Sequence, residues 1–298
     1  MDMTTGTAKR ASAGPTYRLP AQTRVGGVRL RVADLERSLA FYTRVLGFRG
    51  RDSGAGRATL SAADGERPLI ELEERRGAAP VPPRGRLGLF HFAILLPDRA
   101  ALGRLIAHLA ELSVRIGAAD HLVSEAIYLA DPDGLGIEVY ADRPRAAWRY
   151  QAGELAMDTL PLDLGGLRRE AGGKTWSGMP AGTTIGHVHL SVADLVRADD
   201  FYHRGLGLDR VVWSYPGALF LSAGGYHHHL GVNTWAAGAP QAGEDDARLL
   251  EWELLLPGAA DVSAAAGSLA AAGYVVQREK GSATATDPWG TRVRIVPA

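Results

Sequence analysis

The stretch VGGVRLRVADLERSLAFYTRVLGF at residues 25–48 has a second copy, IGHVHLSVADLVRADDFYHRGLGL, at residues 185–208. In each copy a run that alternates apolar and polar residues predicts a strand, and Ala-Asp-Leu then begins a segment with helical spacing of its apolar residues. Short β-rich runs separated by glycine-containing turns follow each helix. Each copy therefore predicts a βαβββ unit of roughly fifty residues.

Two weaker copies of the same unit complete the chain. LFHFAILLPDRAALGRLIAHLAELSV from Leu89 and LLEWELLLPGAADVSAAAGSLAAAGYVV from Leu249 each predict a strand, a proline turn and a helix. Each copy ends in a turn and a strand, DPDGLGIEVY from Asp131 and DPWGTRVRIV from Asp287. The four modules span roughly residues 25–75, 87–142, 185–235 and 248–297.

The composition excludes several classes of protein. The chain has 298 residues, of which 46% are hydrophobic, and this length favours two domains. Lys+Arg and Asp+Glu are both 33, so no basic excess is present to bind nucleic acid or an anionic membrane surface. Without cysteine, a metal would need histidine, carboxylate or water as ligands. We find no apolar signal core or membrane span and expect a cytoplasmic protein.

The module positions predict how the chain is divided. We expect a flexible N-terminal tail at residues 1–22 and a first domain of modules one and two at residues 23–142. Residues 143–184 are rich in Gly, Pro and Arg and are expected to be the linker. Modules three and four would form the second domain at residues 185–298.

Paired βαβββ modules close into a curved, open barrel whose cleft can hold an ion. The opening VADLERSLAFYTRVLGF, the strand HFAILLPD, and the blocks DHLVSEAIYLADPDGLGIEVY and GGYHHHLGVN resemble the vicinal oxygen chelate superfamily. Within it the chain resembles the two-domain extradiol ring-cleaving (catechol 2,3-) dioxygenases, over nearly the whole chain from Val25. The resemblance implies an α+β fold in which four βαβββ modules form two open barrels, the glyoxalase/bleomycin resistance/extradiol dioxygenase fold.

The resemblance also implies a metal site. Members of that enzyme group bind Fe(II), less often Mn(II), through two histidines and one glutamate on the first and last strands of paired modules. The corresponding positions in this chain are Gly27, His91, His187 and Glu251 on the first strands, and Glu138 and Arg294 on the last strands of modules two and four. His91, His187 and Glu138 are therefore implied to bind the metal. Taken singly, each histidine could be a hydrogen-bonded core residue and Glu138 could face solvent.

The three consecutive histidines raise a separate question. The residues after them alternate like a strand, so we expect His228 to face one side and His227 and His229 the other. They would then not bind one ion together. The resemblance makes His228 the proton-transfer group beside the metal, a role that suits a neutral imidazole. It leaves His227 and His229 as packing or substrate-binding residues, and a solvated strand end is the alternative.

Further candidates lie near the predicted site. The resemblance implies that Tyr128, ten residues before Glu138, hydrogen-bonds a substrate oxygen. It makes His121 the second active-site histidine, although a surface histidine is an equal alternative. His189 shares a face with His187 and is the alternative ligand if the register differs. Trp235 is expected in the core or an interface rather than against the substrate.

The implied function is an Fe(II)-dependent, or Mn(II)-dependent, extradiol dioxygenase that acts on a small aromatic diol and O₂. One alternative is a glyoxalase-like metal-dependent isomerase or lyase, since one fold serves many reactions. The other is a ligand-sequestering resistance protein without catalysis. The identity of the diol and any homo-oligomer stay open at this point.

The filled positions predict an unusual pairing of modules. Adjacent pairing would leave modules one and two one ligand short and would bring Glu251 and Arg294 together in the other barrel. Pairing module two with module three unites the whole metal set. We therefore expect the active barrel to be built from modules two and three and the barrel of modules one and four to be empty. The sequence does not decide whether this happens within one chain or between two.

Overall fold

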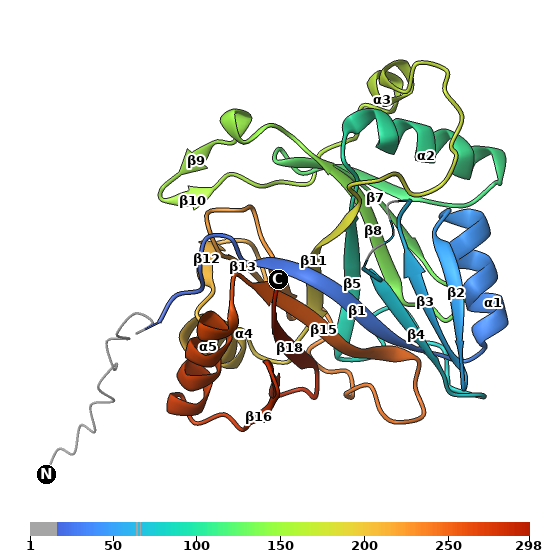
Figure 1. Cartoon of the computed structure of the whole chain (residues 1–298). Coiled ribbons are helices and arrows are strands. Elements are labelled where there is room, and N and C mark those ends of the chain that lie inside the picture. Colours follow the sequence, from blue (N-terminus) through green and yellow to red (C-terminus); the bar gives the residue numbers. More distant parts are fainter. Residues whose placement is uncertain (1–16, 64, 66) are drawn as a thin grey trace, which may run out of the picture.

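Two eight-stranded sheets form the framework of the protein (Figure 1). The computed structural model describes residues 17–63, 65 and 67–298. Most of the expected tail, residues 1–22, lies outside the described residues; at its end the Leu19 backbone N–H donates to the carbonyl of Gly207 (2.9 Å). Within the described part of the chain, no helix combines the length and the apolar character needed to cross a membrane.

The two sheets are named here after the modules that supply their strands. The module 1/4 sheet contains β1 (Arg24–Val32), β2 (Arg49–Gly54), β3 (Arg57–Ser61), β4 (Ile70–Glu74), β15 (Arg248–Leu256), β16 (Val276–Glu279), β17 (Ser282–Thr286) and β18 (Arg292–Pro297). The module 2/3 sheet contains β5 (Gly88–Leu95), β6 (Gly117–Asp120), β7 (Ser124–Ala130), β8 (Gly136–Asp142), β11 (Thr184–Ser191), β12 (Asp209–Val212), β13 (Ala218–Ser222) and β14 (Leu230–Asn233).

The strand order shows which modules pair. It is β16-β17-β18-β15-β1-β4-β3-β2 in one sheet and β12-β13-β14-β11-β5-β8-β7-β6 in the other. At the centres, β1 pairs antiparallel with β15, and β5 pairs antiparallel with β11. The predicted fold of four βαβββ modules is confirmed, and so is the pairing of module two with three and of module one with four. Both pairings occur within one chain.

The helices cover the outer faces of the sheets (Figure 1). They are α1 (Leu35–Ala40), which η1 (Phe41–Val45) continues as a π-helix, α2 (Arg99–Glu111), α4 (Leu195–Asp199), which the π-helix η3 (Asp200–Gly205) continues, and α5 (Ala259–Ala271). The Asp of each Ala-Asp-Leu caps its helix, because the Asp34 and Asp194 side chains accept backbone N–H groups of the first turn.

A repeated buried contact links modules that are neighbours in sequence. The Tyr42 hydroxyl from η1 donates to Asp131 Oδ2 in the turn before β8 (3.2 Å). The Tyr202 hydroxyl from η3 donates in the same way to Asp287 Oδ2 (2.9 Å). The helix of module one therefore stays attached to module two, and that of module three to module four, although their strands lie in different sheets.

The segment expected to be the linker, residues 143–184, carries short elements of its own. These are η2 (Arg145–Ala147), β9 (Tyr150–Gln151), β10 (Glu154–Leu155) and α3 (Leu164–Glu170). Helix α3 packs against α2, and a Cβ at Gly103 would lie 2.2 Å from the Leu167 carbonyl oxygen, so only glycine fits there. The segment then reaches β11 in the module 2/3 sheet (Figure 1).

Candidate metal centre and active site

Two imidazoles and a carboxylate meet on one face of the module 2/3 sheet, called its inner face below. The Nε2 atoms of His91 on β5 and His187 on β11 lie 3.0 Å and 3.1 Å from the same oxygen, Glu138 Oε2 on β8. All three residues are buried. One ligand atom from each lies within 4.8 Å of the others, so the three residues could hold one metal ion.

The strand register brings these side chains together. Ala93 on the central strand β5 lies opposite Glu138 on one side and His187 on the other. His91 precedes Ala93 by two residues and therefore shares its face. The methyl group of Ala93 is fully buried and small, which leaves the space between its neighbours to the longer side chains. The cluster therefore forms because modules two and three pair with each other in one sheet.

A glycine before His187 supports the same arrangement. A bulge between Ile185 and His187 skips Gly186 in the pairing with β5. A Cβ on Gly186 would lie 1.7 Å from the Tyr140 hydroxyl, so only glycine allows this tyrosine to approach the strand. Tyr140 follows Glu138 on the same face of β8 and is fully buried beside the His187 ring.

The protonation states suit a cation site. Burial lowers the pKa of His187 to about 4, so its imidazole is neutral at neutral pH. Burial opposes ionisation of Glu138, but His187 and His91 hold its pKa well below its usual range. Neutral imidazoles and an ionised carboxylate are the forms that coordinate metals.

Two observations indicate that His91, Glu138 and His187 suit a metal ion. His91 Nε2 is buried and has no hydrogen-bond partner, although it lies 3.0 Å from Glu138 Oε2. An unpaired buried nitrogen of this kind is costly unless a ligand completes it. Two ligand atoms each about 2.1 Å from a common ion at right angles would be about 3 Å apart. The pair of imidazoles with one carboxylate fits a divalent ion such as iron or manganese.

A second group of three, His187, His227 and His228, also has ligand atoms within 4.8 Å of one another. His227 is less suited to metal binding because both of its ring nitrogens already have partners. Its Nδ1 lies 2.8 Å from His228 Nδ1, and its Nε2 lies 3.0 Å from Asp142 Oδ1. This group also lacks a carboxylate to balance the charge of an ion. The group that contains Glu138 is therefore the better candidate.

The three consecutive histidines do not form a strand, so the expectation of alternating faces is wrong. β14 begins only at Leu230, after a turn in which Gly224 and Gly225 both have positive φ (61° and 66°). His227 and His228 consequently both approach His187. His229 lines a different cavity, of about 700 Å³, and its Nδ1 accepts the backbone N–H of Ala223 (3.2 Å).

Asp142 fixes which nitrogen of His228 is free. An ionised carboxylate can only accept, so His227 Nε2 carries the hydrogen in the contact with Asp142. When His227 carries only this one proton, its Nδ1 is an acceptor, and His228 Nδ1 is then the donor to it. This leaves the lone pair of His228 on Nε2. Burial also lowers the pKa of His228 well below its usual value, so the ring is neutral.

Asp142 was not predicted from the sequence. It lies four residues after Glu138 in β8, and positions separated by two in a strand face the same side. Glu138, Tyr140 and Asp142 therefore share the inner face. The alternation in GIEVYAD was a signal that could have identified it.

His121 and Tyr128 lie together beside the cluster. His121 Nε2 is within hydrogen-bond distance of the Tyr128 hydroxyl, and its Nδ1 lies 2.8 Å from the Asp158 carbonyl oxygen. Burial and the nearby Glu138 raise the pKa of Tyr128 well above its usual value, so its hydroxyl stays protonated. His121 thus lines the cavity beside Tyr128, and its role in the site stays a prediction.

A cavity of about 410 Å³ opens beside the cluster. Five polar residues, His91, Glu138, His228, His121 and Tyr128, line it, and neither His227 nor His229 does. The remainder is largely apolar and aromatic, with Phe90, Met157, His189, Tyr215, Phe220 and Trp235. Trp235 does not lie in the core: it is 37% exposed and packs edge-on against Phe90 at the cavity wall. No lysine or arginine is among the described residues that line this cavity.

Known proteins of similar sequence or fold give an independent comparison. The family model for the Glyoxalase/Bleomycin resistance protein/Dioxygenase superfamily matches residues 24–139 and 184–295. Catechol-2,3-dioxygenase of Bacillus subtilis (strain 168) is 45% identical over 270 residues, which are 89% of this chain and 94% of that protein.

Solved structures support the fold alone. A structure from Bacillus subtilis is 16% identical and superposes with a TM-score of 0.64, covering 94% of this chain and 86% of that one. Glyoxalase I from Zea mays is 19% identical and superposes with a TM-score of 0.56, covering 93% of this chain and 92% of that one.

Proposed function

Since the chain belongs to the Glyoxalase/Bleomycin resistance protein/Dioxygenase superfamily, we propose that it opens the ring of a catechol-type substrate with O₂ at a non-haem Fe(II) site, by extradiol (meta) cleavage. It is a catechol 2,3-dioxygenase-like enzyme, an oxidoreductase, with 45% identity to catechol-2,3-dioxygenase over most of its length. The observation that carries the proposal is the convergence of His91, Glu138 and His187, two of which, His91 and Glu138, line an aromatic cavity.

His91, Glu138 and His187 would hold the metal, and Mn(II) could take the place of Fe(II) in the same ligand set. When bound, the ion supplies positive charge that favours loss of the hydroxyl protons of the diol, and open positions for substrate oxygens and O₂. The Glu138 carboxylate offsets one of the two charges of such an ion in a buried site.

The remaining polar residues handle protons. His228 Nε2 carries a free lone pair beside the cavity and can accept a proton from a substrate hydroxyl. Asp142 and His227 hold the ring in that tautomer. The protonated Tyr128 hydroxyl, paired with His121, can donate a hydrogen bond to a substrate oxygen. Phe90, Phe220 and Trp235 would hold the aromatic ring of the substrate and keep water out.

The lining of the cavity indicates a substrate without a charged substituent. A carboxylate on the ring would find no lysine or arginine among the described lining residues, and Asp158 lies at the same cavity. Burying an unpaired carboxylate is strongly unfavourable. We therefore expect catechol and alkylcatechols to be cleaved with a higher kcat/KM than 3,4-dihydroxybenzoate, and equal or reversed values would contradict this part of the proposal.

The test of the reaction uses protein loaded with iron under anaerobic conditions. Adding catechol and air should give a yellow ring-opened semialdehyde, and both atoms of ¹⁸O₂ should enter the product. A glyoxalase-like enzyme would consume no O₂, and a sequestering protein would bind catechol without product. Either result would refute the proposed function.

A further inference from the structure

The barrel of modules one and four repeats the layout of the active barrel with charged residues. Arg29 on β1 lies opposite Glu251 on β15, as His189 on β11 lies opposite His91 on β5. The inner face of the module 1/4 sheet therefore carries ion pairs where the other sheet carries imidazoles. This barrel was expected to be empty because its positions lack a set of metal ligands. The role of its charged residues is a separate question.

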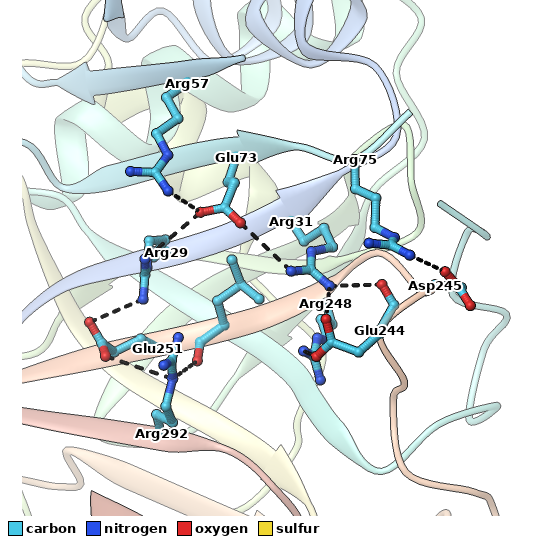
Figure 2. A network of polar contacts seen from close by, with 11 residues as sticks. Arg29, Arg31, Arg57, Glu73, Arg75, Glu244, Asp245, Arg248, Glu251 and Arg292 are labelled. Atoms are coloured by element: carbon cyan, nitrogen blue, oxygen red, sulfur yellow. Dashed lines mark hydrogen bonds and ion pairs between the residues drawn. The ribbon is translucent and has the colours of Figure 1, made fainter. Parts of the chain in front are cut away.

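Positive charge exceeds negative charge in this network (Figure 2). Glu73 contacts Arg29, Arg31 and Arg57. Glu251 contacts Arg29 and Arg292, and Glu244 contacts Arg31 and Arg248. Five arginines thus share three glutamates, while the neighbouring pair of Arg75 and Asp245 is balanced. The network has a formal excess of two positive charges.

Many of these contacts are too long to be hydrogen bonds. Arg29 lies 3.8 Å from Glu73 and 3.6 Å from Glu251, and Arg31 lies 3.6 Å from Glu73. The Nε atoms of Arg29, Arg31 and Arg248 are buried and have no hydrogen-bond partner. Arg31 as a whole is only 9% exposed. Buried donors without partners are costly, so the positive charge of these arginines is incompletely compensated within the protein.

A cavity of about 310 Å³ lies against these arginines. Arg29, Arg31, Arg248 and Arg292 line it together with Glu73 and Glu244, and Thr286 adds a hydroxyl. The lining repeats the excess of two positive charges and would repel a metal cation. We propose that this cavity is a binding site for a small oxyanion with two negative charges, a dicarboxylate or a phosphate. Arginine suits such a ligand because its planar guanidinium can donate two parallel hydrogen bonds to a carboxylate or phosphate.

The site is separate from the cluster of His91, Glu138 and His187, since the two lie on different sheets. The test titrates the full-length protein with inorganic phosphate and, separately, with succinate, at constant ionic strength, by isothermal calorimetry and by the shift in Tm. Saturable binding of one anion per chain is expected. Tighter binding of phosphate would identify a phosphate ligand, and tighter binding of succinate a dicarboxylate. The Glu138→Gln variant should bind the anion with unchanged affinity, which separates this site from the metal centre.

Matched variants locate the site. Arg31→Gln and Arg292→Gln each remove a lining charge and should weaken binding by about tenfold or more, the usual effect of losing a charge-assisted hydrogen bond. Arg292 is 43% exposed in its side chain, so its replacement should fold normally. Arg57→Gln is the control, because Arg57 contacts the same Glu73 but does not line the cavity. Absence of saturable binding of both anions, or an equal loss in Arg57→Gln, would overturn the proposal.

Discussion

Replacing Glu138 by glutamine tests the metal centre through stability rather than activity. The carboxylate is 3% exposed, and one of its oxygens faces both His91 and His187. Glutamine keeps the size of the side chain but removes the charge that a divalent ion needs in a buried site. We expect Glu138→Gln to fold and to lose its response to metal.

The size of the effect follows from linkage. An ion present at a hundred times its Kd stabilises the wild type by about 2.7 kcal/mol. For a chain of 298 residues this corresponds to a rise in Tm of about 4 °C. In the metal-free protein, Glu138→Gln also loses a charge-assisted hydrogen bond to His187, worth about 1.5–3 kcal/mol. The comparison therefore uses the metal-induced shift within each variant, in which this second effect cancels.

The assay is thermal unfolding under anaerobic conditions, with a chelator or with Fe(II) or Mn(II). The wild type should show the shift and Glu138→Gln should show none. Glu253→Gln is the matched control, because it removes a carboxylate from the inner face of the other sheet, where Glu253 pairs with Arg294. It should keep the full shift. A wild-type-sized shift in Glu138→Gln would refute the proposed ligand set.

Three other substitutions test separate parts of the account. His228→Ala should retain metal and bind catechol but turn over about 100 to 10,000 times more slowly, as measured by O₂ uptake, since it removes the proposed proton acceptor. Ala93→Leu should lower the metal content and cost about 1–3 kcal/mol of unfolding free energy, because the larger side chain enters the filled space between Glu138 and His187. For Asp131, burial raises the pKa to about 6 from an ordinary 3.8, so the folded protein binds this proton more tightly than the unfolded chain does. The protonated side chain therefore contributes to the free energy of unfolding below about pH 4, and this contribution is lost as the pH rises through 6. The unfolding free energy of Asp131→Asn relative to wild type should therefore increase by up to about 3 kcal/mol between pH 4 and 7, and a pH-independent difference would contradict it.

The module arrangement could be predicted because it depends on local sequence periodicity and on a few filled positions. The repeated VADL segments predict strand and helix directly, and Gly27 and Arg294 cannot serve as ligands at their positions. Only the pairing of modules two and three then unites His91, Glu138 and His187. The observed strand order shows this pairing.

The histidine run could not be predicted, because its conformation depends on distant contacts. The turn at Gly224 packs against the Ala21 backbone, and only glycine fits there because a Cβ would lie 2.2 Å from the Ala21 carbonyl oxygen. His227 is held by Asp142, which comes from another module. These contacts override the alternating pattern, which predicts a strand three residues too early. The place of Trp235 at the cavity wall likewise depends on Phe90, which is far away in sequence.

The central claim is that modules two and three of one chain together form a single metal centre. Its most direct test is a crystal structure of the iron-loaded protein with anomalous scattering recorded at the iron edge. We expect one peak bonded to His91 Nε2, His187 Nε2 and a Glu138 oxygen, each at about 2.0–2.2 Å. A peak held instead by His187, His227 and His228, or no peak in protein that cleaves catechol, would contradict the account.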